Sequence, residues 1–328
     1  MNSENQTGSL NSPKPQNSAN FLFNEYGRLR SGWRFLIFQF LFVVFAAAFG
    51  TTILFLFEKL LVVFEKGSVL SFMFQSSVMF VPSLFLGWLC GKILEGLPFR
   101  ALGLWFTKNW WKDLAFGLAI GTISITFAVI LAALFGGMRL QMNESAGRSA
   151  ILLTLGVSLV VFIGGALAEE AYFRGYILQT FARAKLIWFG VLMTSVFFAT
   201  AHNSNQDATY LSWFNTFLAG IWFCVAYLKT RNLWFAVGLH LMWNWLQGAF
   251  FGISVSGITS LTTAPVLQQT DKGIKLWTGG DYGIEGGIAC TIALVLSGVL
   301  IWFAPFLKPA EEMLELTDKE NPLERPTL

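Results

Sequence analysis

The sequence predicts an all-α membrane protein, a polytopic bundle of about eight transmembrane helices. Of its 328 residues, 55% are hydrophobic and only 12% are charged, whereas soluble domains carry about 25% charged residues. Apolar stretches of about 20 residues, the length that crosses a bilayer, recur along the chain. These stretches show no strict alternation of apolar and polar residues, so a transmembrane β-barrel is not expected.

The two ends of the chain differ in composition from the middle. Residues 1–20 are polar and rich in Asn, Ser and Pro, which predicts a disordered tail. Residues 21–34 mix aromatic side chains with basic ones, which is typical of a segment at the membrane interface. We expect one membrane domain over 21–309, followed by an acidic and solvated C-terminal tail over 310–328.

Hydropathy divides the membrane domain into consecutive spans. We place them near 33–57, 69–91, 113–135, 151–178, 186–203, 209–228, 233–251 and 284–307. Lys and Arg concentrate in the loops on the side of the two termini, which the positive-inside rule assigns to the cytoplasm. We therefore expect an integral protein of the bacterial cytoplasmic membrane, surrounded by lipid, with both termini cytoplasmic. The formal net charge of +3 does not indicate a nucleic-acid partner.

Ionisable side chains within a bilayer are costly unless they have partners, so each one marks a possible functional site. In this chain they concentrate in the fourth, fifth and seventh expected spans, and they include both histidines of the sequence. With one accompanying amide, these residues are Glu169, Glu170, Arg174, His202, His240 and Asn244.

Helical geometry predicts that these residues meet. A hairpin that closes at the basic residues 183–185 brings Glu169 and His202 to nearly the same depth. Glu170 and Arg174 are spaced i,i+4 and share a helix face. Because Glu169 is rotated by about 100° from Glu170, we expect Glu170 to pair with Arg174. Glu169 is then expected to face the histidines alone.

The residues form three motifs in a fixed order along the chain. They are E-E-x-x-x-R at Glu169, Glu170 and Arg174, F-x-x-x-H at Phe198 and His202, and H-x-x-x-N at His240 and Asn244. Together the motifs resemble the CPBP family, the CAAX-processing and bacteriocin-processing intramembrane endopeptidases. The resemblance covers roughly residues 85–305, with the motifs inside 169–244.

The resemblance implies a peptidase and a role for each motif residue. Glu169 and His202 would activate water for attack on a peptide bond, and His240 and Asn244 would stabilise the oxyanion. Glu170 and Arg174 would support the site or position the substrate. The substrate would be a membrane-associated peptide or protein, with prenylated C-terminal motifs, peptide maturation and bacteriocin self-immunity as possible contexts.

Two questions stay open at this point. Glu169, His202 and His240 are a permissible set of ligands for zinc or another divalent ion, yet a glutamate and a histidine can also activate water without a metal. The same polar cluster could also serve a non-catalytic membrane protein that binds or transports a ligand or a proton. That alternative predicts a water-lined route across the membrane.

Overall fold

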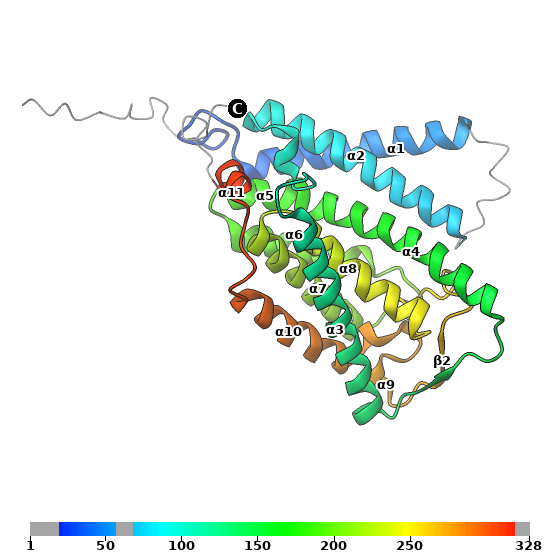
Figure 1. The fold of residues 1–328 in the computed structure, drawn as a ribbon. Coiled ribbons are helices and arrows are strands. Elements are labelled where there is room, and N and C mark those ends of the chain that lie inside the picture. The colour runs from blue at the N-terminus through cyan, green and yellow to red at the C-terminus, as the bar shows by residue number, and fades with distance from the viewer. Residues whose placement is uncertain (1–19, 57–67, 319–328) are drawn as a thin grey trace, which may run out of the picture.

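The computed structural model describes residues 20–56 and 68–318, so the expected disordered tail lies almost entirely outside the described residues. Long apolar helices dominate the structure (Figure 1). The α-helices of the described chain, long and short, are α1 (Ser31–Leu56), α2 (Val69–Glu95), α3 (Trp110–Gly136), α4 (Arg148–Glu170), α5 (Leu178–Arg183), α6 (Ile187–Ala201), α7 (Tyr210–Thr230), α8 (Trp234–Trp245), α9 (Lys275–Thr278), α10 (Ile288–Phe303) and α11 (Glu311–Asp318).

Each of the expected spans coincides with a helical segment, which confirms the polytopic all-α bundle. Five helical segments in the described chain have the length and composition to cross a membrane, namely 31–56, 69–95, 110–136, 148–183 and 210–230. The segment 148–183 is continuous because the π-helix η3 (Ala171–Ile177) joins α4 to α5. A helix satisfies its own backbone hydrogen bonds, which is why apolar sequence in lipid takes this form.

Close helix packing fixes the elements that carry the polar motifs. A Cβ added to Gly117 of α3 would lie 2.3 Å from the carbonyl oxygen of Phe235 in α8. A Cβ on Gly220 of α7 would lie 2.7 Å from the Cα of Ser195 in α6. Small residues let helices approach to backbone contact, as they do in membrane bundles. Both helices that bear a histidine motif are thus held by a glycine contact.

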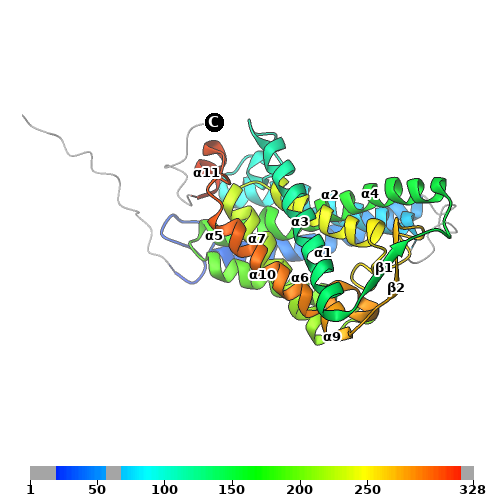
Figure 2. The same cartoon turned by 60° about the horizontal axis from the view of Figure 1, so that its bottom comes forward.

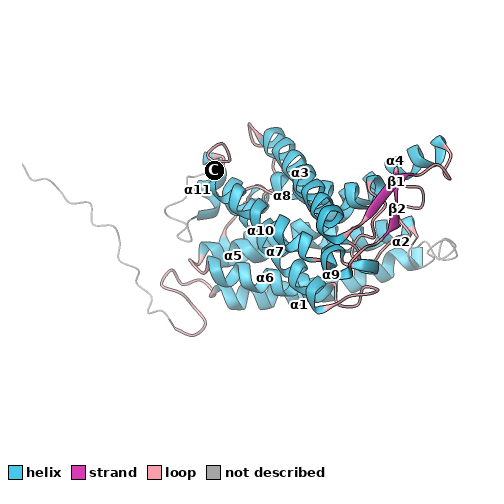
Figure 3. Ribbon diagram, turned by 90° about the horizontal axis from the view of Figure 1, so that it is seen from below, coloured by secondary structure: helices cyan, strands magenta, loops and turns pink. Residues whose placement is uncertain are grey.

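The two ends of the bundle differ in structure. Strands β1 (Arg139–Met142) and β2 (Leu267–Asp271) pair antiparallel at one end, beside α9. Helices α5 and α11 lie at the other end (Figures 2 and 3). The last expected span, 284–307, is shorter than expected, because α10 begins at Ile288 after the 3-10 turns η5 (Gly280–Tyr282) and η6 (Ile284–Gly286).

The structure corrects the expectation of a solvated C-terminal tail. Residues 311–318 form the amphipathic helix α11, in which Met313 and Leu316 are buried. Half of its residues are acidic, namely Glu311, Glu312, Glu315 and Asp318, so the composition of the segment does not reveal its short apolar stripe. The prediction of a solvated segment is wrong for this helix, and the rest of the tail lies outside the described residues.

Two basic residues are also buried, one from the expected interfacial segment 21–34 and one from the expected hairpin turn at 183–185. Arg34 and Arg183 both bind the Glu95 carboxylate, at 3.1 and 2.7 Å, and none of these side chains is more than 1% exposed. Thr180 adds a hydrogen bond to Glu95 at 3.0 Å. The chain then reverses at residues 184–186, close to where the hairpin between the fourth and fifth spans was expected.

Candidate active site

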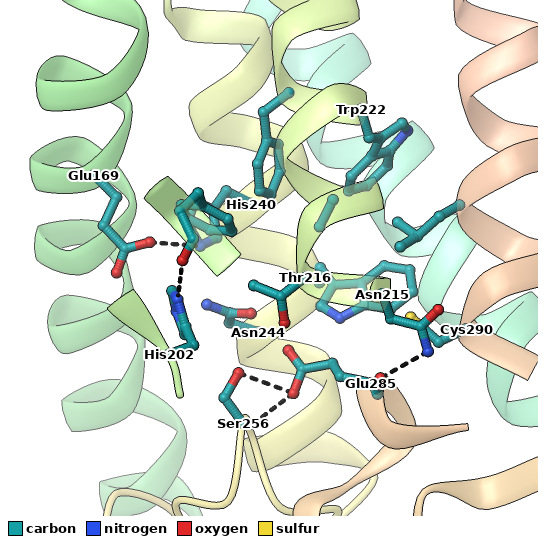
Figure 4. A pocket seen from close by; sticks show the side chains of 15 residues that line it. Glu169, His202, Asn215, Thr216, Trp222, His240, Asn244, Ser256, Glu285 and Cys290 are labelled. Carbon is teal, nitrogen blue, oxygen red and sulfur yellow. Dashed lines mark hydrogen bonds and ion pairs between the residues drawn. The ribbon is translucent and has the colours of Figure 1, made fainter. Parts of the chain in front are cut away.

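The motif residues gather around one cavity inside the bundle (Figure 4). Glu169 and Glu170 form the last turn of α4, and His202 directly follows the end of α6. His240 and Asn244 lie on α8, which continues into the π-helix η4 (Leu246–Phe250). The E-E-x-x-x-R and H-x-x-x-N motifs therefore both lie where a helix widens into π geometry, a feature that is frequent at functional sites.

His240 lies between the two glutamates. Its Nδ1 is 3.0 Å from Glu170 Oε1, and its Nε2 is 3.7 Å from Glu169 Oε2. The expectation that Glu169 alone would face a histidine is therefore wrong. The carboxylates do point in different directions, but an imidazole offers one nitrogen on each side and can reach both.

Arg174 pairs with Glu170, as the spacing predicted. The two fully buried side chains are 3.1 Å apart, and the guanidinium also donates to the Gly220 carbonyl at 3.1 Å. The guanidinium lies 4.9 and 5.0 Å from the ring centroids of Phe198 and Phe223. These contacts partly compensate the cost of a buried charge. Arg174 thereby fixes Glu170, and Glu170 fixes His240.

Phe198 orients His202 through its backbone and its ring. The Phe198 carbonyl oxygen lies 2.7 Å from His202 Nδ1, and the two ring centroids are 4.8 Å apart. A carbonyl can only accept, so Nδ1 carries the hydrogen, and Nε2 of the neutral imidazole keeps a free lone pair. This tautomer is the one required of a base.

The cavity itself has a volume of about 60 Å³. That is room for a few waters, because one water needs about 10–15 Å³ on this measure. Glu169, His202, His240 and Asn244 all line it, so the structure brings the predicted catalytic residues to one place. Glu169 Oε2 is buried and has no hydrogen-bond partner within the described chain.

Sequence analysis missed one side of the cavity. Glu285, Asn215 and Ser256 also line it, and none of them belongs to a motif. Burial raises the pKa of Glu285 above its usual range, against the opposing effect of hydrogen bonds from Ser256 and Gln247. Burial and the neighbouring Glu285 also raise the pKa of Tyr282 to about 12. The sequence does offer one signal, because Glu285 is the one carboxylate within the last expected span, 284–307, and lies at its glycine-rich start.

The zinc ion that the resemblance allowed stays a prediction. Catalytic zinc is held by three protein ligands at about 2.0–2.2 Å. Over residues 20–56 and 68–318, no three His, Cys, Asp or Glu side chains converge as a metal-binding group. We therefore derive the chemistry of the site from the side chains themselves.

Comparison with known proteins identifies the segment that carries the motifs. Residues 150–246 match the family model of Rce1-like type II CAAX prenyl endopeptidases. The match contains all three motifs and confirms the resemblance that they indicated.

Two bacterial proteins are similar to this chain. An uncharacterized 24.3 kDa protein of Escherichia coli is 36% identical over 104 residues, which is 31% of this chain and 45% of that protein. The uncharacterized protein YyaK of Bacillus subtilis (strain 168) is 24% identical over 232 residues, which is 66% of this chain and 70% of that protein. The chain thus spans less than half the length of the first relative.

Proposed function

Because residues 150–246 of this chain match the family model of Rce1-like type II CAAX prenyl endopeptidases, we propose that the protein is an intramembrane endopeptidase. It hydrolyses a peptide bond of a membrane-associated peptide or protein. Glu169 and His202 activate the attacking water, while His240 and Asn244 stabilise the oxyanion. The site lies in the bacterial cytoplasmic membrane, and both termini face the cytoplasm.

The observation that carries this proposal is the unpartnered oxygen of Glu169. This Oε2 is buried beside the cavity, 3.7 Å from His240 Nε2 and beyond ordinary hydrogen-bond length. A buried carboxylate oxygen without a donor costs about 1–3 kcal/mol. A water that donates to Glu169 would recover this free energy and would lie within reach of a substrate carbonyl.

The reaction needs only one water molecule and the side chains of the cavity. Glu169, assisted by the free Nε2 of His202, takes a proton as the water oxygen forms a bond to the carbonyl carbon. The carbonyl oxygen becomes an oxyanion, which accepts hydrogen bonds from His240 Nε2–H and the Asn244 amide. The carbon–nitrogen bond then breaks, and the abstracted proton passes to the leaving amine.

His240 can donate to the oxyanion because Glu170 and Arg174 support the opposite side of its ring. When doubly protonated, its imidazole donates to Glu170 through Nδ1 and keeps an Nε2–H on the side of Glu169 and the cavity. The neighbouring carboxylates balance the positive charge, and Arg174 neutralises Glu170 in turn. Glu170, Arg174 and Phe198 are therefore supporting residues in this proposal.

The proposal is tested by peptidase assays on the purified protein in proteoliposomes. Membrane-anchored peptides are incubated with wild type, Glu169→Ala, His202→Ala and the exposed control Glu144→Ala, and the products are identified by mass spectrometry. We expect cleavage by wild type and the control, and a loss of about 10²–10⁴-fold in the other two variants. Cleavage at the wild-type rate by either site variant would refute the assignment.

The same assay separates the alternative function. A protein that uses this polar cluster to bind or transport a ligand or a proton would cleave no peptide at all. It would instead move its ligand across the proteoliposome membrane, and that flux would depend on Glu169.

A further inference from the structure

Glu285 lines the side of the cavity that lies away from Glu169 (Figure 4). It belongs to the short turn η6, just before α10. Its Oε2 accepts hydrogen bonds from the Ser256 backbone N–H at 2.5 Å, the Ser256 hydroxyl at 3.0 Å and Gln247 Nε2 at 3.2 Å. One carboxylate oxygen thus joins three donors from two other segments of the chain.

The first of these segments carries Asn244. Gln247 follows Asn244 by three residues, on the π-helix η4 that continues α8. Its side chain is fully buried, and besides Glu285 it donates to the Ser254 carbonyl at 2.6 Å. A displacement of Glu285 would therefore act directly on the end of the helix that presents Asn244.

The second segment reaches the turn that carries His202. The Ser256 carbonyl accepts a hydrogen bond from Asn205 Nδ2 at 3.0 Å, and the Asn205 N–H donates to the His202 carbonyl at 3.1 Å. The two turns are in close contact, because a Cβ added to Gly257 would lie only 2.2 Å from the Gln206 carbonyl oxygen. The position of Ser256 therefore limits where the His202 turn can lie.

Ser256 adopts a conformation that requires support. Its φ is +48°, in the left-handed region that non-glycine residues rarely adopt. Such a conformation is unfavourable for a residue with a Cβ and persists only where its surroundings determine it. The two hydrogen bonds from Ser256 to Glu285 offset that cost.

The turn that carries Glu285 is itself fixed by side chains of two helices. Asn215 of α7 donates through Nδ2 to the backbone carbonyls of Glu285 and Gly287, at 2.8 and 2.9 Å. Thr291 of α10 donates to the Asn215 Oδ1 at 2.6 Å. The η6 turn is thereby fixed between two helices that carry none of the motif residues.

We propose that Glu285 is a positioning residue, which sets the separation of His202 and Asn244 across the cavity. It acts through Ser256 and Gln247 and need not touch the reacting atoms. The inference rests on the proposed function, because that function assigns His202 to water activation and Asn244 to the oxyanion.

The experiment exploits the fact that the chain has only two histidines. Full-length protein labelled with ¹³C at histidine gives one NMR signal for His202 and one for His240. We expect Glu285→Ala to shift the His202 signal and to leave His240 nearly in place, because Glu169 and Glu170 hold His240 independently. Glu285→Gln keeps an acceptor oxygen and should restore the wild-type His202 signal. Asp281→Ala, in the same loop but exposed, is the matched control and should change neither signal.

Kinetics provide a second readout. Glu285→Ala should lower kcat about 100-fold, which is the effect of a misplacement of about 1 Å, with little change in KM, and Glu285→Gln should recover most of the loss. An unchanged His202 signal in Glu285→Ala would overturn the proposal. Glu285→Gln as damaging as Glu285→Ala would also overturn it.

Two further outcomes are decided by the same set of variants. If Glu285→Ala does not fold, Ser256→Ala, which removes one of the two Ser256 donors, should still shift the His202 signal. An unmoved signal there counts against the proposal. If wild type cleaves no peptide, the proposed function fails, while the NMR comparison continues to test the positioning role.

Discussion

Arg174→Met is expected to destabilise the protein strongly, because it leaves the Glu170 carboxylate buried without its cation. Both side chains are 0% exposed, and their charged atoms are 3.1 Å apart. Removal of one partner from such a pair costs about 3–5 kcal/mol in free energy of unfolding. The ratio of folded to unfolded protein would then fall by roughly 10²–10⁴.

The double variant Glu170→Gln with Arg174→Met separates the ion pair from general damage. It removes both charges but keeps an oxygen that can accept from His240 Nδ1, so most of the lost stability should return. The assay is SDS-induced unfolding in mixed micelles, followed by tryptophan fluorescence, on wild type, both single variants and the double variant. The reasoning is refuted if Arg174→Met unfolds like wild type, or if the double variant is no more stable than Arg174→Met.

Three further predictions follow from other parts of the molecule. Gly117→Ala places a Cβ 2.3 Å from a backbone oxygen of α8 and should lower the free energy of unfolding by about 1–3 kcal/mol in the same assay. The control Gly156→Ala meets nothing within 4 Å and should not lower it. Equal stabilities of the two variants would contradict close packing at Gly117. Because burial raises the pKa of Glu285, the folded state retains a proton that the unfolded chain releases, so its contribution to stability is lost as pH rises through the folded pKa. The melting temperature of wild type relative to Glu285→Gln should therefore fall as pH rises above 4.5, the ordinary carboxyl pKa, and a rise would disprove the sign. Since the proposed reaction uses only water and side chains, metal chelators should leave turnover unchanged, and inhibition that added zinc reverses would show a metal requirement.

Much of the fold could be predicted from the sequence because lipid imposes a simple rule on every span. Apolar segments of sufficient length must be helical, so hydropathy located the long apolar helices that the structure describes. Composition was less informative outside the bilayer. The helix α11 was missed because the buried Met313 and Leu316 are surrounded in sequence by acidic residues. The strands β1 and β2 are four and five residues long, and they produce no hydropathy signal.

The candidate site was predictable to the extent that its residues are unusual for a membrane helix. Glu169, His202 and His240 stood out because charged and imidazole groups are rare in apolar spans. Glu285 did not stand out, because a carboxylate at the end of a span is normally solvated. Its burial depends on the fold of residues 251–287 around it, which no local spacing reveals. The burial of Arg34 against Glu95 was hidden for the same reason.

The most direct test of the account is hydrolysis in ¹⁸O-labelled water by wild type and by the isosteric variant Glu169→Gln. The account predicts that wild type produces a cleaved peptide whose new carboxyl group carries one ¹⁸O atom, and that Glu169→Gln produces at least about 10²-fold less of it. Labelled product from Glu169→Gln at the wild-type rate would contradict the claim that Glu169 activates the water.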